Sequence, residues 1–152
     1  MLANWFDERD ATELLRRLES LTPDARPRWG SFSPSQVVCH LTAPVRVALG
    51  EKQAARLAGP LSTPGLAHFV VWLAPWPKGA PTAPEFLPDR GMTKSTEFLQ
   101  DKQTLVDALR RFSDIAPQRA LPPNPVFGEL SRRGWGRLVW RHLDHHLRQF
   151  GL

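Results

Sequence analysis

The chain has 152 residues, a length that fits one domain with a sizeable core, and we expect a single domain over residues 1–152. Its only cysteine, Cys39, excludes an intrachain disulfide and a cysteine-based zinc ribbon. The net charge of +5 comes mostly from scattered arginines, without the dense basic block of a nucleic-acid surface, so we expect no nucleic acid as a partner.

Two helices are predicted in the first third of the chain. Leucines at helical spacing between charged residues predict the first helix over residues 7–21, and the prolines that follow end it. Ser33 and Pro34 are typical of a helix cap and a first-turn proline, and they predict a second helix over residues 34–50. This helix carries His40 and, four residues later, a proline whose ring would clash with the carbonyl of His40, so we expect a kink there.

The middle of the chain is less regular than its C-terminal third. The apolar run 66–76 predicts a short buried helix, and the proline-rich stretch 75–88 predicts an ordered, irregular loop. Helical spacing predicts a further helix over 95–112 and a final one that starts near residues 130–135 and reaches Phe150. Since no strand-like alternation or internal repeat stands out, we expect an all-α fold, a four-helix up-and-down bundle with a long proline-rich connector.

The chain shows no sign of a signal peptide or a membrane span. Its first residues lack the charged-then-apolar order of a signal peptide, and no run approaches the roughly 18 apolar residues of a membrane helix. We therefore expect a cytoplasmic protein with no membrane partner.

Three of the five histidines gather in the final predicted helix. His142 and His146 are spaced i, i+4, so a helix places both imidazoles on one face, close enough to share a metal ion. That face is the apolar, core-facing side of the helix, whereas Arg137, Arg141 and Asp144 project away from it. Polar groups buried there without partners would each cost roughly 1–3 kcal/mol, so the pair needs an explanation.

Two explanations for this polar stripe remain open. The first is a hydrogen-bonded network in the core, or a cleft filled with solvent. The second is a metal site completed by His40, which lies at the edge of the apolar face of the second predicted helix. Three neutral imidazoles bind zinc, nickel or ferrous iron and leave at least one position open for water or a substrate atom, which is typical of catalytic sites.

Residues near the pair have several candidate roles. His145 projects about 100° away from the next histidine, so it lines the cleft, supports a ligand or lies on the helix surface. Gln149 either orients a ligand or bound water, or simply borders the helix. The six tryptophans belong mostly to the core, but Trp29, Trp76 and Trp135 are candidates for a cleft wall.

Other chemistry is not supported by the sequence. His68 stands alone in an apolar run and is interpreted as a structural or surface residue, and Cys39 as a small packing residue. A zinc-protease helix is excluded because Leu143 stands where the His-Glu-x-x-His pattern needs its glutamate. The chain also contains no Gly-x-Ser-x-Gly motif and no phosphate-cradling glycine loop.

Three segments of the chain together resemble a known superfamily. The residues that carry the likeness are the segment 29–41, which ends in Cys-His40-Leu, the proline-rich loop 76–86, and the terminal segment 142–150 with its His-x-x-x-His spacing and closing Leu-Arg-Gln-Phe. The chain is similar over residues 29–151 to the DinB/YfiT-like superfamily of metal-dependent four-helix bundles, most closely to a branch of unknown function.

The resemblance implies a four-helix bundle that holds one divalent metal ion through a histidine of the second helix and two of the last. These map onto His40, His142 and His146, the same three residues that the helical pattern indicates. Characterised relatives include transferases and isomerases that depend on a thiol cofactor, so a low-molecular-weight thiol is a second expected cofactor. The likeness also suggests a homodimer formed through helix faces.

Two functional hypotheses follow. The first is a metal-dependent enzyme that acts on a small molecule as a thiol S-transferase or a hydrolase, with His145 as proton shuttle and Gln149 as the residue that orients a ligand. The second is a non-catalytic bundle that binds a metal or ligand in its cleft, for example in a stress-related role. A carboxylate beside the open metal position would favour the enzyme.

Overall fold

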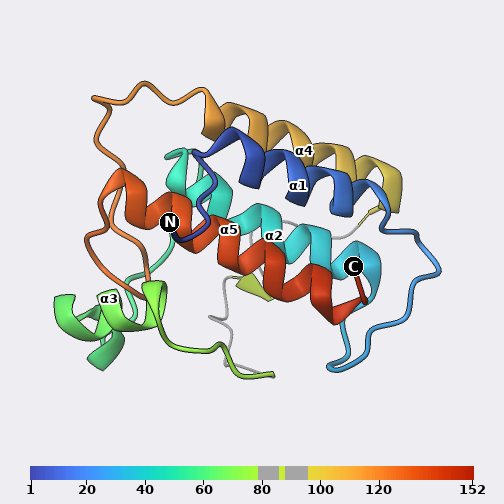
Figure 1. The fold of residues 1–152 in the computed structure, drawn as a ribbon, viewed down its shortest axis with the longest axis horizontal. Coiled ribbons are helices and arrows are strands. Elements are labelled where there is room, and N and C mark those ends of the chain that lie inside the picture. The colour runs from blue at the N-terminus through green and yellow to red at the C-terminus, as the bar shows by residue number, and fades with distance from the viewer. Residues whose placement is uncertain (79–85, 88–95) are drawn as a thin grey trace.

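The computed structural model describes residues 1–78, 86–87 and 96–152, and in these ranges the chain is helical and contains no strand (Figure 1). The predicted all-α, four-helix bundle is confirmed, with one short extra helix beside it. The elements are α1 (Glu8–Glu19), α2 (Pro34–Ala48), the 3-10 turn η1 (Pro60–Ser62), α3 (Pro64–Trp72), α4 (Phe98–Ser113) and α5 (Arg132–Gln149).

Side-chain caps define where the long helices begin. The Asp7 carboxylate accepts hydrogen bonds from two backbone amides in the first turn of α1. At α2, the Ser33 hydroxyl accepts from the backbone of Gln36 while the Gln36 side chain accepts from the backbone of Ser33, a capping box that satisfies two amides. At α5, the Ser131 hydroxyl accepts a hydrogen bond from the backbone amide of Gly134. Helix α2 then continues past Pro44 to Ala48.

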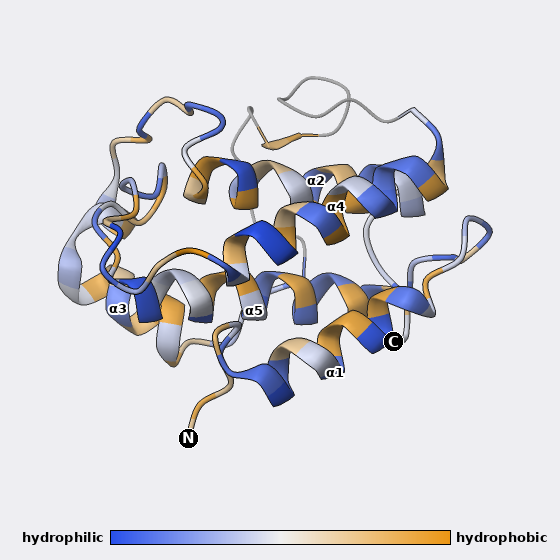
Figure 2. Ribbon diagram, turned by 90° about the horizontal axis from the view of Figure 1, so that it is seen from above, coloured by the Kyte–Doolittle hydropathy of each residue, from blue (hydrophilic) through white to orange (hydrophobic). Residues whose placement is uncertain are grey.

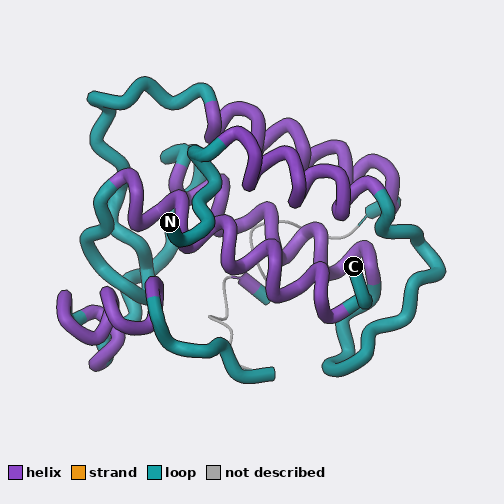
Figure 3. The backbone as a smooth tube through the Cα atoms, viewed as in Figure 1, coloured by secondary structure: helices purple, strands orange, loops and turns teal. Residues whose placement is uncertain are grey.

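The four long helices run along one axis of the molecule (Figure 3). Consecutive helices α1 and α2 are antiparallel, as are α4 and α5, whereas α2 and α4 run the same way (Figure 1). Side-chain hydrogen bonds join helix ends that lie at the same end of the bundle. Lys102 at the start of α4 donates to the carbonyl of Glu19 at the end of α1. Arg119, just after α4, donates to the carbonyl of Leu49 at the end of α2. The long connector between α2 and α4 therefore returns the chain to the end of the bundle where α2 began, and the helix directions do not alternate as the expected up-and-down order would require.

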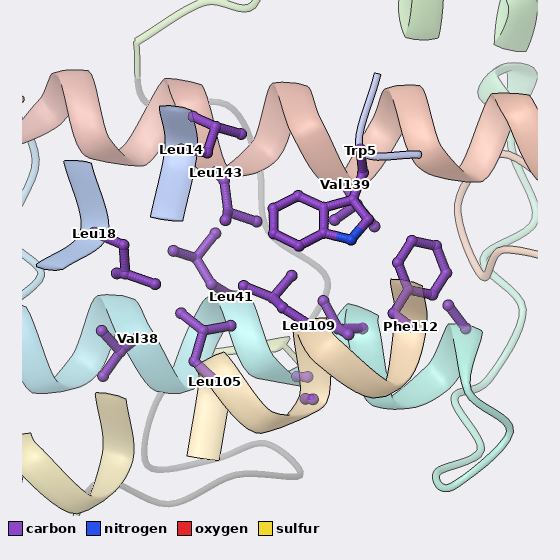
Figure 4. Packing of buried hydrophobic residues seen from close by; sticks show 14 of the residues in the cluster. Trp5, Leu14, Leu18, Val38, Leu41, Leu105, Leu109, Phe112, Val139 and Leu143 are labelled. Carbon is purple, nitrogen blue, oxygen red and sulfur yellow. The ribbon is translucent and has the colours of Figure 1, made fainter. Parts of the chain in front are cut away.

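The core lies between these four helices. Leu41 of α2, Leu105 and Leu109 of α4 and Leu143 of α5 are all less than 2% exposed and point toward a common centre (Figure 4). Along α1 and α4 the hydrophobic positions alternate with hydrophilic ones (Figure 2), because these helices have one buried and one solvent-facing side.

Helix α3 differs from its prediction. The apolar run 66–76 was expected to be a buried helix, but the helix ends at Trp72, and Leu66, Phe69 and Leu73 are 38%, 50% and 64% exposed. The reason is its position outside the four-helix bundle, where it packs on α5 with only Ala67 and Val71 buried (Figure 1).

The same packing changes the environment of two arginines of α5. Arg137 and Arg141 do project away from the core, but α3 covers that side of the helix. Arg137 is 8% exposed and donates to the carbonyls of Ala3 and Trp72, and Arg141 donates to the carbonyls of Val70 and Val71. The two side chains therefore fasten α3 to α5.

Two sequence predictions concern the connector and the membrane. The loop predicted over residues 75–88 lies only partly within the structure, because residues 79–85 and 88 are outside the described ranges. Among the described helices, none is both long enough and apolar enough to cross a bilayer.

Candidate metal centre

Three histidines from two helices come together in the fold. His40 comes from α2, and His142 and His146 come from α5, one turn apart. One ring nitrogen of each lies within 4.8 Å of the others, and the ring centroids are 4.7, 4.8 and 5.0 Å apart. His40 is 4% exposed and the two histidines of α5 are half-buried. The structure thus brings together the three residues that the sequence predicts as metal ligands.

A backbone carbonyl sets the orientation of His40. Its Nδ1 lies 2.7 Å from the carbonyl oxygen of Phe86, in the connector. Because a carbonyl only accepts, Nδ1 must carry the hydrogen and donate it. In the neutral ring, Nε2 is then left with a free lone pair, and this atom faces His142.

A side-chain relay sets the orientation of His146. The Gln149 amide nitrogen donates to the carbonyl of Trp29 at 2.7 Å, which fixes the amide so that its oxygen points to His146. That oxygen accepts a hydrogen bond of 2.8 Å from His146 Nδ1. The Nε2 atom of His146 is again the one with the lone pair, so Gln149 holds this ring in the tautomer that a metal ligand needs.

Gly30 makes room for this relay. Its φ of +73° lies in the left-handed region that favours glycine, and a Cβ placed there would lie 2.6 Å from the Gln149 amide nitrogen. Both the backbone conformation and the contact therefore require glycine at this position.

The distance between His40 and His142 indicates what the cluster can bind. Their Nε2 atoms are 2.8 Å apart. Two lone pairs at this separation repel one another unless a proton or a cation lies between them. The three histidines could hold a metal ion, since neutral imidazole nitrogen is a metal ligand and the Nδ1 hydrogens of His40 and His146 are already held elsewhere.

The surroundings keep the three rings neutral. Burial lowers the pKa of His40 and lowers that of His142 well below the ordinary value, with repulsion from neighbouring histidines acting in the same direction. Burial, followed by the charge of His40, lowers the pKa of His146 to about 3. The rings are therefore in the unprotonated form that metal binding requires at neutral pH.

A cavity of about 580 Å³ opens beside the cluster. All three histidines line it, together with His145, Gln149 and a largely apolar wall that includes several aromatic side chains. The histidines thus face a space large enough for a small molecule.

Two of the three predicted wall tryptophans border this cavity. Trp29 and Trp76 line it. Trp135, which was predicted with them, lies in the core instead: it is completely buried and its ring nitrogen donates to the carbonyl of Pro122. Trp135, near the start of α5, is packed inside the bundle, and the helix lines the cavity only from Leu138 onward.

His145 lies in the cavity wall between two indole rings. Its ring centroid is 5.8 Å from that of Trp29 and 6.1 Å from that of Trp76, and burial lowers its pKa. It stands 5.1 Å from the ring of His146, nearly perpendicular to it. This position resolves the sequence alternatives in favour of a cavity-lining residue.

No carboxylate lines the cavity among the residues that the structure describes. Asp144 points away from it, as predicted, and pairs with Arg17 at 2.8 Å and Arg148 at 2.9 Å. The other two candidates also lie outside: His68 is exposed and stacks on Trp72, and Cys39 is buried.

Several functional groups of the site were not anticipated. The Phe86 carbonyl orients His40 and the Trp29 carbonyl orients Gln149, but a backbone carbonyl leaves no signal in a sequence. Phe32, whose ring lies 5.3 Å from His40 and 6.2 Å from His146, also packs on the cluster. The one available sign was Gly30, a glycine just before the cap of the helix that carries His40.

Comparison with known proteins places the chain in a family. A family model described as a protein of unknown function, DUF1569, matches residues 6–151. No curated protein and no solved structure matches the chain. Because the family model matches nearly the whole length of the chain, the chain belongs to the DUF1569 family.

Proposed function

We propose that the chain is a metal-dependent enzyme that acts on a small molecule, as a thiol S-transferase or a hydrolase. The observation that carries this proposal is the convergence of His40, His142 and His146 at the edge of a cavity, with two of the rings held by hydrogen bonds at Nδ1. The resemblance to DinB/YfiT-like bundles, some of which use a thiol cofactor, supports the same reaction classes.

The three histidines would hold a divalent ion of zinc, nickel or iron. Such an ion acts as a Lewis acid and lowers the pKa of a water or thiol, which supplies a nucleophile near neutral pH. The protein contributes neutral rings in fixed orientations, because the Phe86 carbonyl holds His40 and Gln149 holds His146.

His145 is the candidate proton shuttle. It lines the cavity next to His146, and its lowered pKa leaves it neutral and able to accept a proton at neutral pH. Trp29 and Trp76 flank its ring and limit its movement. A substrate in the cavity would therefore lie within reach of a base as well as of the histidine cluster.

One observation favours a second candidate function. Metal-dependent hydrolases commonly use a carboxylate as general base, and the described lining residues include none. A bundle that binds a metal or a small ligand without turnover, for example in a stress-related role, is consistent with this feature.

Turnover assays with defined metal content separate these functions. The protein is loaded in turn with zinc, nickel or ferrous iron and assayed with low-molecular-weight thiols plus electrophiles, and with ester and amide panels. The enzyme predicts metal-dependent turnover that is lost in the H142A/H146A double variant and retained in H68A, which removes an exposed histidine outside the site. If metal is bound but no substrate turns over with any of the ions, the binding protein is the better account.

A further inference from the structure

The wall of the cavity indicates what kind of molecule it accepts. We propose that the cavity binds a small molecule with a flat apolar body and one anionic donor group, the body against Trp29, Trp76 and Phe127 and the donor group toward the three histidines. This inference rests on the proposed function, because the histidine cluster gives the donor group its place.

The first argument is the composition of the wall. Five aromatic side chains line the cavity, and they come from four separate segments of the chain: Trp29, Phe32, Trp76, Phe86 and Phe127. Aromatic faces stack on flat apolar molecules, with a gain of about 0.5–1.5 kcal/mol per pair beyond area burial. A volume of about 580 Å³ lies within the range of sites that bind small ligands.

The second argument is that Trp76 is held in place before any ligand binds. Its ring nitrogen donates to the carbonyl of Val70 at 3.2 Å, and the guanidinium of Arg141 lies 5.1 Å from its ring. Arg141 in turn donates to carbonyls at the end of α3. When a ligand stacks on this indole, little side-chain entropy is lost, because the ring is already fixed.

The third argument is that amide groups of two lining side chains, Gln149 and Asn124, already have partners within the protein. The Gln149 amide is used at both ends, by Trp29 and His146. The Asn124 side-chain oxygen accepts from the backbone amides of Val126 and Phe127. A sugar or a peptide-like molecule needs several free hydrogen-bonding partners, so this wall suits an apolar body better.

The fourth argument concerns charge. Lys78 places its ammonium group 4.8 Å from the Trp29 ring, Arg141 lies beside Trp76, and the described lining residues contribute no carboxylate. A divalent ion on three neutral imidazoles adds two uncompensated positive charges. The site as a whole therefore favours a ligand whose donor group is anionic.

Three probes of matched chemistry test the ligand class. The zinc-loaded chain is titrated by calorimetry with three probes. These are 2-naphthoate, acetate, which has the same carboxylate and no aromatic body, and 2-naphthamide, which has the same aromatic body and no charge. We expect 2-naphthoate to bind roughly 100-fold tighter than acetate and about tenfold tighter than 2-naphthamide. Equal affinity for 2-naphthoate and either control overturns the proposal.

Variants locate the binding site on the wall. Trp76→Ala and Phe127→Ala should each weaken 2-naphthoate binding roughly tenfold. The matched control is Trp72→Ala, which removes a tryptophan of α3 that does not line the cavity. Zinc content equal to wild type shows that a variant is still folded at the site. Unchanged 2-naphthoate affinity in both wall variants contradicts the proposal.

The outcomes for metal and ligand are separable. A chain that holds no metal but binds 2-naphthoate through Trp76 contradicts the proposed function and supports the ligand class. A chain that holds metal but binds 2-naphthoate no better than acetate supports the metal site and overturns the ligand class.

Discussion

Helix α5 borders two interiors that are built in opposite ways. On one side, Val139 and Leu143 join the leucines of α1, α2 and α4 in a core that is held together mainly by apolar packing (Figure 4). On the other side, His142 and His146 face a cavity, and His146 depends on one acceptor, Gln149. His40 depends in the same way on the carbonyl of Phe86.

The difference shows how the fold separates stability from function. The apolar core gains free energy from packing and tolerates no polar group without a partner. The histidine cluster costs desolvation free energy, which its hydrogen bonds offset only in part, so it adds little to folding unless a cation binds there. Substitutions in the core should therefore alter stability without altering metal binding. Substitutions around the histidine cluster should alter metal binding and change stability little.

The largest effect on stability is expected in the core. Leu109→Ala removes a completely buried side chain of α4 and should lower the free energy of unfolding by about 2–5 kcal/mol, measured by urea denaturation. Metal bound per folded chain should stay at the wild-type value. Loss of metal from folded Leu109→Ala protein would show that the two interiors are coupled.

The next effect concerns the residue that orients His146. Gln149→Leu removes the acceptor for the His146 Nδ1 hydrogen, and metal affinity should fall about 10- to 100-fold in a chelator competition titration. Gln103→Leu, on the exposed face of α4, is the matched control and should bind metal like wild type.

Gly30→Ala sharpens this test without touching a polar group. The added Cβ would collide with the Gln149 amide and requires a backbone conformation that alanine rarely adopts, so metal affinity should fall in the same direction. Wild-type affinity in both Gln149→Leu and Gly30→Ala would show that the relay does not support the metal site.

The stability of the metal-free protein should depend on pH through His146. The pKa of His146 is about 3 in the folded chain and near 6.5 when the chain is unfolded, so as the pH falls below 6.5 the unfolded chain takes up the proton first. Stability should fall from about pH 6.5 down toward pH 3, with His146 alone responsible for a loss on the order of 1–2 kcal/mol by pH 5.

Urea unfolding at pH 7 and pH 5, with chelator present, measures this loss. His146→Asn keeps a donor near Gln149 but cannot titrate, and it should lose less stability than wild type over the same interval. An identical loss in both proteins would mean that His146 is not kept neutral by its surroundings.

The smallest effect is expected at Asp144, which lies between two histidines in the sequence but points away from the cavity. Asp144→Asn weakens its ion pairs with Arg17 and Arg148 and should cost about 1 kcal/mol or less in urea denaturation. Metal content and any turnover should not change. A loss of either in folded protein would give this carboxylate a role in the site.

Much of the fold could be predicted from the sequence because its signals are local. The cap at Ser33, the helical spacing of leucines and the proline stops place α1, α2 and α4 to within a few residues. Helix α3 shows the limit: its high hydropathy predicted burial, but its position was decided by packing on α5, where Arg137 and Arg141 hold it.

In the candidate site too, features with a local sequence signal could be predicted and features set by the whole fold could not. The i, i+4 spacing of His142 and His146 predicts a shared face, and His40 was found on the apolar edge of its own helix. What could not be predicted were the two backbone acceptors, the Phe86 carbonyl that orients His40 and the Trp29 carbonyl that orients Gln149, because both come from loops whose positions depend on the whole fold. The same dependence moved Trp135 from the expected cavity wall to the core.

The central claim, that the histidine cluster is a metal centre, is tested most directly by elemental analysis of the purified chain. We predict close to one divalent ion per chain in wild type and in H68A, and almost none in H142A/H146A. Absence of metal from wild type, even after incubation with zinc, nickel or ferrous iron, or full retention of metal by the double variant, would contradict the claim.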